Sequence, residues 1–225
     1  MSEQSDENSI GGAVGIGLLV GGFVPFTTVD FPDHLGAVVF CQGCAWRCRY
    51  CHNTHLQGVR SVGDEGGPEL VPWENVRRAL ENRRGFLEAV VFSGGEPTAQ
   101  PGLAAALTDM RGMGYLTGLH TAGMHPERLH AVLPLLDWVG LDIKAPFDER
   151  YDRVTGRPAS WEPVRRSLEL LLASGVNYEL RTTVHPSLLG ECDLRELRGT
   201  LEELGAKPTN IQPFRREGCA DEGLL

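Results

Sequence analysis

Three cysteines stand close together in the first quarter of the chain, and their spacing suits metal chemistry. Cys44, Cys48 and Cys51 form a C-x3-C-x2-C pattern within the segment GCAWRCRYCHN, residues 43–53. Thiolates are soft ligands that suit iron–sulfur clusters or zinc. A cubane cluster has four irons, so three cysteines leave one iron without a protein ligand. An open metal position is where a substrate or cofactor can bind and react, as in catalytic zinc sites.

The spacing alone leaves other interpretations open. The cysteines could form a structural zinc site with Cys41 or His52 as the fourth ligand. They could hold a four-cysteine electron-transfer cluster that uses Cys41, or they could remain unligated thiols. Cys41 lies three residues before Cys44 in an apolar run. That position favours a buried strand residue over a ligand.

The text around the cysteines resembles a known signature. C-x3-C-x2-C ending in Tyr-Cys-His-Asn is similar to the motif of the radical S-adenosylmethionine (SAM) enzymes. The stretch GFVPFTTVDFPDHLGAVVFCQGCAWRCRYCHN, residues 22–53, resembles more narrowly the activating proteins of anaerobic ribonucleotide reductase. The resemblance implies that Cys44, Cys48 and Cys51 hold a [4Fe–4S] cluster whose fourth iron chelates SAM. One electron would then split SAM into methionine and a 5′-deoxyadenosyl radical.

The remaining chain alternates short apolar runs with helical patterns, which predicts an α/β fold with parallel strands. An open doubly wound sheet and a curved partial barrel both fit, and the resemblance implies a partial (β/α)6 radical SAM barrel. Residues 1–12 read as a disordered tail and residues 13–225 as a single domain. Strands are predicted over 18–26, 37–41, 89–92, 116–120, 138–143, 178–184 and 210–214, and helices over 72–83, 103–113, 126–133, 163–173 and 193–204.

In either architecture, ligands gather at the carboxyl ends of the strands. The strand over 89–92 is followed by Gly94, Gly95 and Glu96. Glycines let the backbone approach a ligand closely, and Glu96 offers a carboxylate to an ammonium. Alone, the motif also fits a glycine turn with a surface acid. In register after the cysteines, it resembles the family's GGEP motif, which binds the methionine amino group of SAM.

The next two strand ends carry further candidates. Thr121 could hydrogen-bond a ligand, whereas His120 reads as a half-buried histidine. Asp142 and Lys144 alternate onto one side of their strand, where they could form an ion pair at the barrel rim. The resemblance of LDIKAP to glycyl-radical activators implies SAM contacts instead, with Lys144 facing the carboxylate or ribose.

On the strand over 178–184, Glu179, Arg181 and Thr183 share one face. Polar residues facing a barrel interior are costly unless they are satisfied, so Arg181 is a candidate for the SAM carboxylate or for the radical-bearing product. His185 is equally compatible with a rim histidine. By resemblance, Gln212 contacts the adenosine.

Within the cysteine segment, the resemblance places Tyr50 against the adenine, mostly through backbone contacts. His52 and Asn53 match the activators and would shape the surroundings of the cluster. The Ala45-Trp46-Arg47 insert differs from the commoner versions, and we expect it to alter only the local surface.

Composition bounds the function. The chain has 225 residues and a net charge of −9, from 30 acidic and 21 basic residues. This balance argues against nucleic acid as a partner, because phosphate binding needs a basic face. Residues 1–9 lack a basic signal region, and residues 10–24 contain six glycines, too many for a membrane helix. We expect a cytoplasmic protein.

We therefore predict a radical SAM enzyme that abstracts a hydrogen from a backbone glycine of anaerobic ribonucleotide reductase. By the same resemblance, its electron donor would be a flavodoxin or a ferredoxin. A glycine radical is flanked by an amide nitrogen and a carbonyl, and no side chain obstructs its approach. One alternative is a radical SAM enzyme acting on a small molecule such as a deazapurine precursor. Another is a non-catalytic zinc or iron–sulfur module.

Overall fold

The computed structural model describes residues 16–58 and 69–224. The predicted disordered tail over residues 1–12 lies outside the described residues. No described helix is long and apolar enough to cross a membrane.

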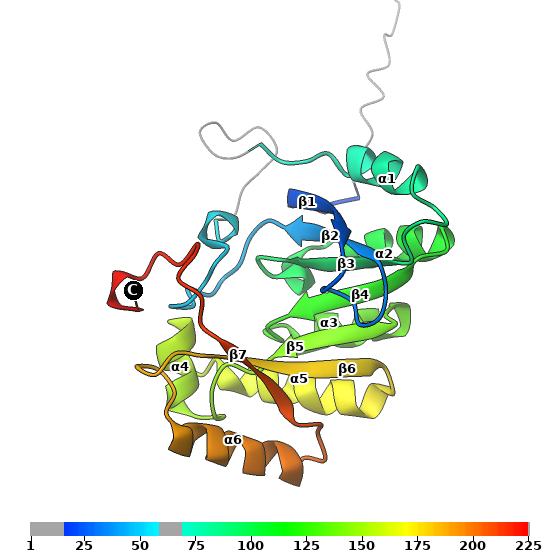
Figure 1. Ribbon diagram of the computed structural model, residues 1–225. Helices are drawn as coiled ribbons and strands as arrows, with labels where there is room; N and C mark the ends of the chain where they lie inside the picture. The colour runs from blue at the N-terminus through cyan, green and yellow to red at the C-terminus, as the bar shows by residue number, and fades with distance from the viewer. Residues whose placement is uncertain (1–15, 59–68, 225) are drawn as a thin grey trace, which may run out of the picture.

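The described chain forms a single seven-stranded sheet whose strands follow one another in chain order (Figure 1). Strand β1 is antiparallel to β2, and all later neighbours are parallel. The strands are β1 (Val20–Thr27), β2 (Gly36–Cys41), β3 (Ala89–Gly94), β4 (Leu116–Thr121), β5 (Trp138–Asp142), β6 (Asn177–Val184) and β7 (Thr209–Pro213).

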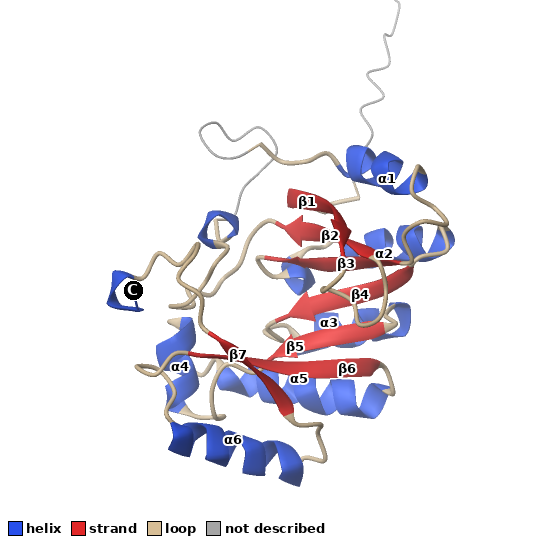
Figure 2. Cartoon of the chain, viewed as in Figure 1, coloured by secondary structure: helices blue, strands red, loops and turns tan. Residues whose placement is uncertain are grey.

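Helices alternate with these strands, as Figure 2 shows by colour. They are α1 (Trp73–Glu81), α2 (Leu103–Gly112), α3 (Pro126–Val132), α4 (Glu149–Thr155), α5 (Trp161–Ser174) and α6 (Glu191–Glu203). Short 3-10 helices are η1 (Thr54–Leu56), η2 (Pro97–Ala99), η3 (Leu133–Leu135) and η4 (Glu222–Leu224). A doubly wound sheet reverses its strand order at a switch point. The consecutive order found here has no reversal, so the predicted partial barrel is confirmed and the doubly wound alternative is wrong.

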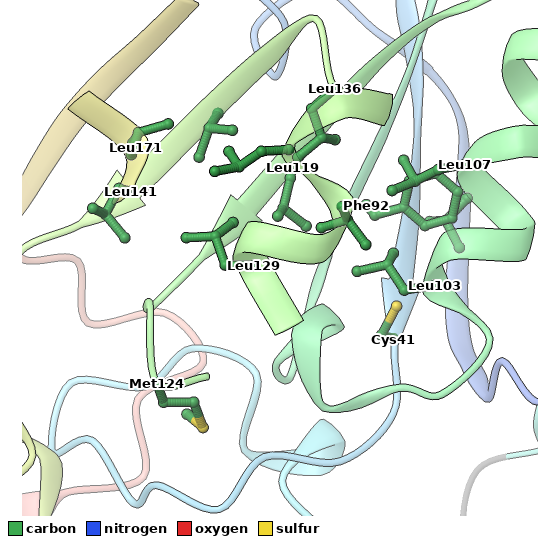
Figure 3. Close-up of a cluster of buried hydrophobic side chains, with 14 of the residues drawn as sticks. Cys41, Phe92, Leu103, Leu107, Leu119, Met124, Leu129, Leu136, Leu141 and Leu171 are labelled. Carbon is green, nitrogen blue, oxygen red and sulfur yellow. The ribbon is translucent and has the colours of Figure 1, made fainter. Parts of the chain in front are cut away.

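The two faces of the sheet bury different sets of side chains, because successive residues of a strand point to opposite sides. In β3, Val90 and Phe92 belong to the main core, which also holds helical residues such as Leu107, Leu129 and Leu168. Figure 3 shows Phe92, Leu107 and Leu129 together in this layer. The helices therefore cover one face, and the opposite face is left to form the interior of the partial barrel.

At the amino-terminal end of the strands, that interior is closed by a small second cluster. Phe31, from the loop between β1 and β2, packs with Val91 and Trp138. The Phe31 and Trp138 ring centroids lie 5.7 Å apart. This cluster, here called the Phe31 plug, fills the amino-terminal end of the interior with apolar side chains.

The strand predicted over residues 18–26 is β1, which pairs antiparallel with β2. Two features differ from the sequence-based expectations. Pro72 precedes the first residue of α1 instead of forming its first turn. Helix α4 was not predicted, because its seven residues are mostly polar and only Tyr151 and Val154 mark a buried face. Asp148 caps its start, and Gly156, at φ +69°, ends it.

Phe31→Ala tests the role of the plug. Phe31 is 6% exposed, and removing a buried phenyl ring costs about 3 kcal/mol of unfolding free energy. Phe86→Ala is the matched control, because Phe86 is 63% exposed and a surface truncation changes stability by about 0.5 kcal/mol or less. Urea denaturation of both variants measures the difference. Equal midpoints would show that the loop does not close the barrel.

Candidate radical SAM site

A cavity of about 340 Å³ lies at the carboxyl ends of the parallel strands. Its walls come from the loop after β2, which carries the three cysteines, and from the ends of β3 to β7. The predicted site residues that line it are Cys44, Cys48, Tyr50, Cys51, Gly94, Gly95, Thr121, Asp142, Lys144, Arg181 and Gln212. Residues separated by up to 168 positions in the chain thus meet around one space, and Glu96 alone among the predicted site residues does not line it.

The cysteine loop, residues 42–53, is held by backbone hydrogen bonds at both of its ends and in its middle. Gly43 N–H donates to the carbonyl of Leu56 at 2.7 Å. Arg47 and Arg49 N–H groups donate to the carbonyls of Thr155 and Val154, both at 2.9 Å. These carbonyls belong to the last turn of α4, where helical acceptors have no partner of their own. The unpredicted helix α4 therefore supports the loop.

The glycine pair after β3 is required by the closeness of the cysteine loop. Gly94 has φ +111°, and a Cβ there would lie 2.5 Å from the backbone nitrogen of Cys41. A Cβ on Gly95 would lie 2.3 Å from the carbonyl oxygen of Gly43. Any side chain would push the two backbones apart. Two hydrogen bonds join them instead, Gly95 N–H to Cys41 O and Glu96 N–H to Gly43 O, both at 2.9 Å.

Glu96 is fully buried, and its carboxylate orders the turn. Oε1 accepts hydrogen bonds from the backbone and hydroxyl of Thr98, at 3.0 and 2.6 Å, and from the Thr121 hydroxyl at 2.7 Å. Oε2 accepts from Ala122 N–H at 2.9 Å. Thr121 in turn accepts a bond from Gly123 N–H at 3.0 Å. The carboxylate thus ties the end of β3 to the end of β4.

Three charged side chains converge on the opposite wall. Asp142 Oδ1 accepts from Arg181 Nη2 at 2.9 Å, and Asp142 Oδ2 lies 3.3 Å from Lys144 Nζ. Burial raises the pKa of Asp142, but the charges of Arg181 and Lys144 outweigh it and hold the pKa at about 2. Lys144 Nζ also lies 5.6 Å from the centre of the Tyr50 ring, which is 6% exposed. The wall carries one negative and two positive charges.

The floor of the cavity is made by residues of the barrel interior. His120 donates from Nε2 to the carbonyl of Asp30 at 3.0 Å and packs edge-on against Trp138. Burial and the Arg181 charge lower the pKa of His120 to about 3, so its imidazole is neutral. A Cβ on Gly140 would lie 3.1 Å from both His120 Cδ2 and Arg181 Cζ. The glycine therefore makes the room in which these two side chains meet.

Comparison with known proteins agrees with this geometry. A sequence profile of the radical SAM superfamily matches residues 38–204. A pyruvate formate-lyase-activating enzyme from Clostridium pasteurianum is 32% identical over 197 residues, covering 84% of this chain and 79% of that protein. A protein from Methanocaldococcus jannaschii named as a glycyl-radical enzyme activating enzyme is 29% identical over 210 residues, covering 91% and 83%.

The match extends over most of the described chain and includes the cysteine loop and the ends of β2 to β6. The chain belongs to the radical SAM superfamily. The solved structure of anSMEcpe with bound AdoMet shares the fold, with a TM-score of 0.59 at 17% identity over 77% of this chain and 50% of that chain. Members of the superfamily use a [4Fe–4S] cluster and SAM, so the predicted cofactors are confirmed.

The donor set of this radical SAM protein fits such a cluster. The three cysteines line one cavity from one loop. Within residues 16–58 and 69–224, no three His, Cys, Asp or Glu side chains converge closely enough to hold one metal ion. On a cubane each thiolate binds a different iron, so convergence on one point is not required. Burial raises the pKa of Cys44 to about 12 and also raises that of Cys48. Binding to a metal cluster would deprotonate thiols so placed.

Cys41, the residue that complicated the sequence pattern, faces away from this loop. It is fully buried in the main core. Figure 3 shows its side chain among the apolar residues near Leu103. Burial, followed by the charge of Glu96, raises the pKa of its thiol far above the usual range. The expected buried strand residue is confirmed.

Some lining residues were not recognised as part of the site. Trp46 was expected to affect only the surface, but it is 5% exposed and lines the cavity. Its ring centroid lies 6.2 Å from that of Tyr151. Ser93 and Gln57 also line the cavity. The sequence signal that could have identified Trp46 is a large apolar indole within an otherwise polar loop. His185 does not line the cavity; its Nδ1 lies 2.7 Å from Ser187 Oγ.

Gly94→Ala tests the close approach of the two loops. The new methyl group collides with backbone atoms at a positive φ, so we expect a loss of about 3 kcal/mol or more of unfolding free energy. Gly114→Ala is the control, because Gly114 has φ +90° but no atom within 4 Å of its Cβ position. It should lose only about 1 kcal/mol from backbone strain. Thermal unfolding that shifts equally in both variants would contradict the packing argument.

Asp142→Asn tests the charged wall in cluster-free protein. The Asp142 side chain is 36% exposed, so we expect only about 1 kcal/mol of destabilisation at pH 7. Its folded pKa of about 2 lies below the ordinary value of 3.8. The stabilisation is therefore complete above pH 4 and is lost as pH falls towards 2. Denaturation curves of wild type and variant should converge over that range, and a constant gap would refute this assignment.

Proposed function

We propose that Cys44, Cys48 and Cys51 hold the [4Fe–4S] cluster, and that this enzyme activates a glycyl-radical enzyme, with anaerobic ribonucleotide reductase as the target. The observation that carries the site assignment is that the three cysteines, the Gly94–Gly95 turn and the charged wall line one cavity. The relatives' names support the class of target. The segment over residues 22–53 supports the reductase as the individual target.

The bound cluster and SAM would supply one-electron reductive cleavage of SAM and, through it, abstraction of an α-hydrogen from a glycine of the partner. The chain's own residues bind and orient. Gly94 and Gly95 let backbone atoms reach the ligand. The Lys144 ammonium and the Arg181 guanidinium suit the SAM carboxylate.

The remaining assignments concern the adenosine and the amino group. Tyr50 is proposed to lie against the adenine, with Gln212 at the open edge of β7 and Thr121 at the end of β4 as polar partners. The Glu96 carboxylate accepts four hydrogen bonds, three on Oε1 and one on Oε2. Its predicted contact with the SAM ammonium therefore requires a second hydrogen bond to Oε2.

The electron donor is proposed to be an acidic protein such as a flavodoxin or a ferredoxin. The chain is acidic overall, yet exposed arginines hold the outer side of the cysteine loop. Arg47 Nη1 donates to the carbonyl of Cys44 at 2.7 Å, and Arg157 Nε donates to that of Ala45 at 3.0 Å. A positive surface directly over the cluster loop would steer a negative partner to the shortest electron path.

Cluster content and SAM cleavage test the class of activity. After anaerobic reconstitution, we expect about four irons per chain and 5′-deoxyadenosine on reduction with dithionite and SAM. Cys51→Ala should lose both, because one iron then lacks its ligand. Cys192→Ala is the control, since Cys192 is exposed and far from the pattern. One bound zinc and intact SAM in the wild type would refute the proposal.

Activation of a partner tests the narrower proposal. Reduced enzyme, SAM and an anaerobic ribonucleotide reductase should give the doublet electron paramagnetic resonance signal of a glycyl radical in the reductase. Replacing the acceptor glycine of that reductase with alanine is the control. A radical formed in pyruvate formate-lyase instead would keep the class and change the target. SAM cleavage with no radical in either protein would favour a small-molecule substrate.

Arg157→Gln tests the electron-donor surface. At low salt, we expect the rate of cluster reduction by flavodoxin, relative to reduction by dithionite, to fall about two- to five-fold. The difference should disappear at high salt, because ions screen exposed charges. Arg165→Gln is the control, since Arg165 pairs with Glu169 on α5. An unchanged ratio would place the donor elsewhere.

A further inference from the structure

The last described residues return from the far edge of the sheet to the cysteine loop. Strand β7 is the edge strand opposite β1, and residues 214–224, here called the C-terminal strap, follow it. Figure 1 shows this red segment passing beside the cyan part of the chain, which contains the end of the cysteine loop. The strap therefore connects the last strand to the loop that follows the second.

The first contact is an ion pair. Arg49, between Cys48 and Cys51 in the sequence, lies with its Nε 2.6 Å from Asp221 Oδ2. Asp221 Oδ1 accepts a second hydrogen bond from Gly223 N–H at 2.9 Å, which fixes the carboxylate. A Cβ on Gly223 would lie 3.2 Å from Arg49 Nη2. The guanidinium is thus held between the carboxylate and the strap backbone.

The second set of contacts involves the residue after Cys51. His52 Nε2 lies 2.8 Å from the carbonyl of Arg215, to which it donates. A Cβ on Gly218 would lie 2.9 Å from the carbonyl oxygen of His52, so only glycine allows this approach. The Cys219 thiol donates to the Arg49 carbonyl at 3.4 Å. The strap thus grips the chain on both sides of Tyr50 and Cys51.

The strap is anchored beyond these contacts. Leu224 is 3% exposed and belongs to the main hydrophobic core. Cys219 is partly buried against the same core. The strap is therefore fixed at both ends, by β7 at its start and by the core at Leu224. Its contacts with the cysteine loop can restrict the movement of that loop.

We propose that the C-terminal strap is part of the cluster-binding site and that Asp221 is a positioning residue, which acts through Arg49 on the segment that carries Cys48 and Cys51. This inference rests on the proposed ligation of the cluster by Cys44, Cys48 and Cys51. Helix α4 holds the loop through the backbone of Arg47 and Arg49. The strap holds it independently through the Arg49 and His52 side chains.

One consequence is that the site is completed by residues from both ends of the sheet. The cysteine loop follows β2, but its geometry depends on residues more than 160 positions later. If the strap were released, the three cysteines would still be present, but the position of Cys51 relative to Cys44 would be less well fixed. The expected defect is therefore faster loss of the cluster, without loss of the fold.

The test compares cluster retention in three variants of the reconstituted full chain. Asp221→Asn removes the charge of the pair, Asp221→Glu restores it, and Glu222→Gln removes a neighbouring exposed charge as the matched control. Iron release to excess bathophenanthroline is followed by absorbance under anaerobic conditions. Because the pair is partly exposed, we expect release from Asp221→Asn to be about two- to five-fold faster than from wild type. Asp221→Glu should return towards the wild-type rate, and Glu222→Gln should match it.

Two further readouts separate positioning from general stability. Thermal unfolding of the cluster-free proteins should give similar midpoints, while the paramagnetic resonance spectrum of the reduced cluster should broaden in Asp221→Asn alone. Equal iron release from Asp221→Asn and wild type would overturn the proposal, as would equal acceleration in Glu222→Gln. A stable cluster that fails to cleave SAM would contradict the proposed function and leave the strap result unaffected.

Discussion

The close approach of two backbones, at the ends of β2 and β3, is the constraint on which the rest of the site depends. Gly94 and Gly95 bring the turn after β3 within hydrogen-bond distance of Cys41 and Gly43. Side chains at these two positions would separate the cysteine loop from the neighbouring strand end. Glu96 then extends the same connection to β4 by accepting bonds from Thr121 and Ala122. Three strand ends are thereby joined into one rigid rim, and rigid support is what a reactive site requires.

The cysteine loop is further held by elements that come much later in the chain. The last turn of α4 accepts hydrogen bonds from the loop backbone, and the C-terminal strap holds the Arg49 and His52 side chains. The loop also buries two aromatic side chains of its own, Trp46 and Tyr50, in the main core. Cys44 and Cys48 pack against the same core. Its geometry therefore comes from this burial together with the hydrogen bonds and the ion pair made to later parts of the chain.

The charged wall shows how a polar interior is stabilised in a barrel. Asp142 lies between Arg181 and Lys144, so the one acid neutralises part of two bases. The wall keeps excess positive charge, which suits a carboxylate-bearing ligand such as SAM. His120 is neutral on the floor, and the Phe31 plug closes the far end. The charges of Asp142, Lys144 and Arg181 thus lie at the end of the barrel where the cysteines lie, and Phe31 packs at the opposite end.

The sequence by itself predicted a metal-binding cysteine loop, the alternation of strands and helices, and most of the lining residues, and its resemblance to the radical SAM motif implied the cofactors. Those features depend on local patterns: cysteine spacing, β-branched runs and polar residues directly after strands. Tertiary structure decided that Trp46 lines the cavity, that Glu96 is buried in the turn, and that α4 and the strap support the loop. The position of Trp46 depends on which side of the loop meets the core. The contacts of Glu96, α4 and Asp221 join residues that are distant in the chain, and no local pattern specifies such a meeting. These contacts form only when the parallel strands align their carboxyl ends at one edge of the sheet.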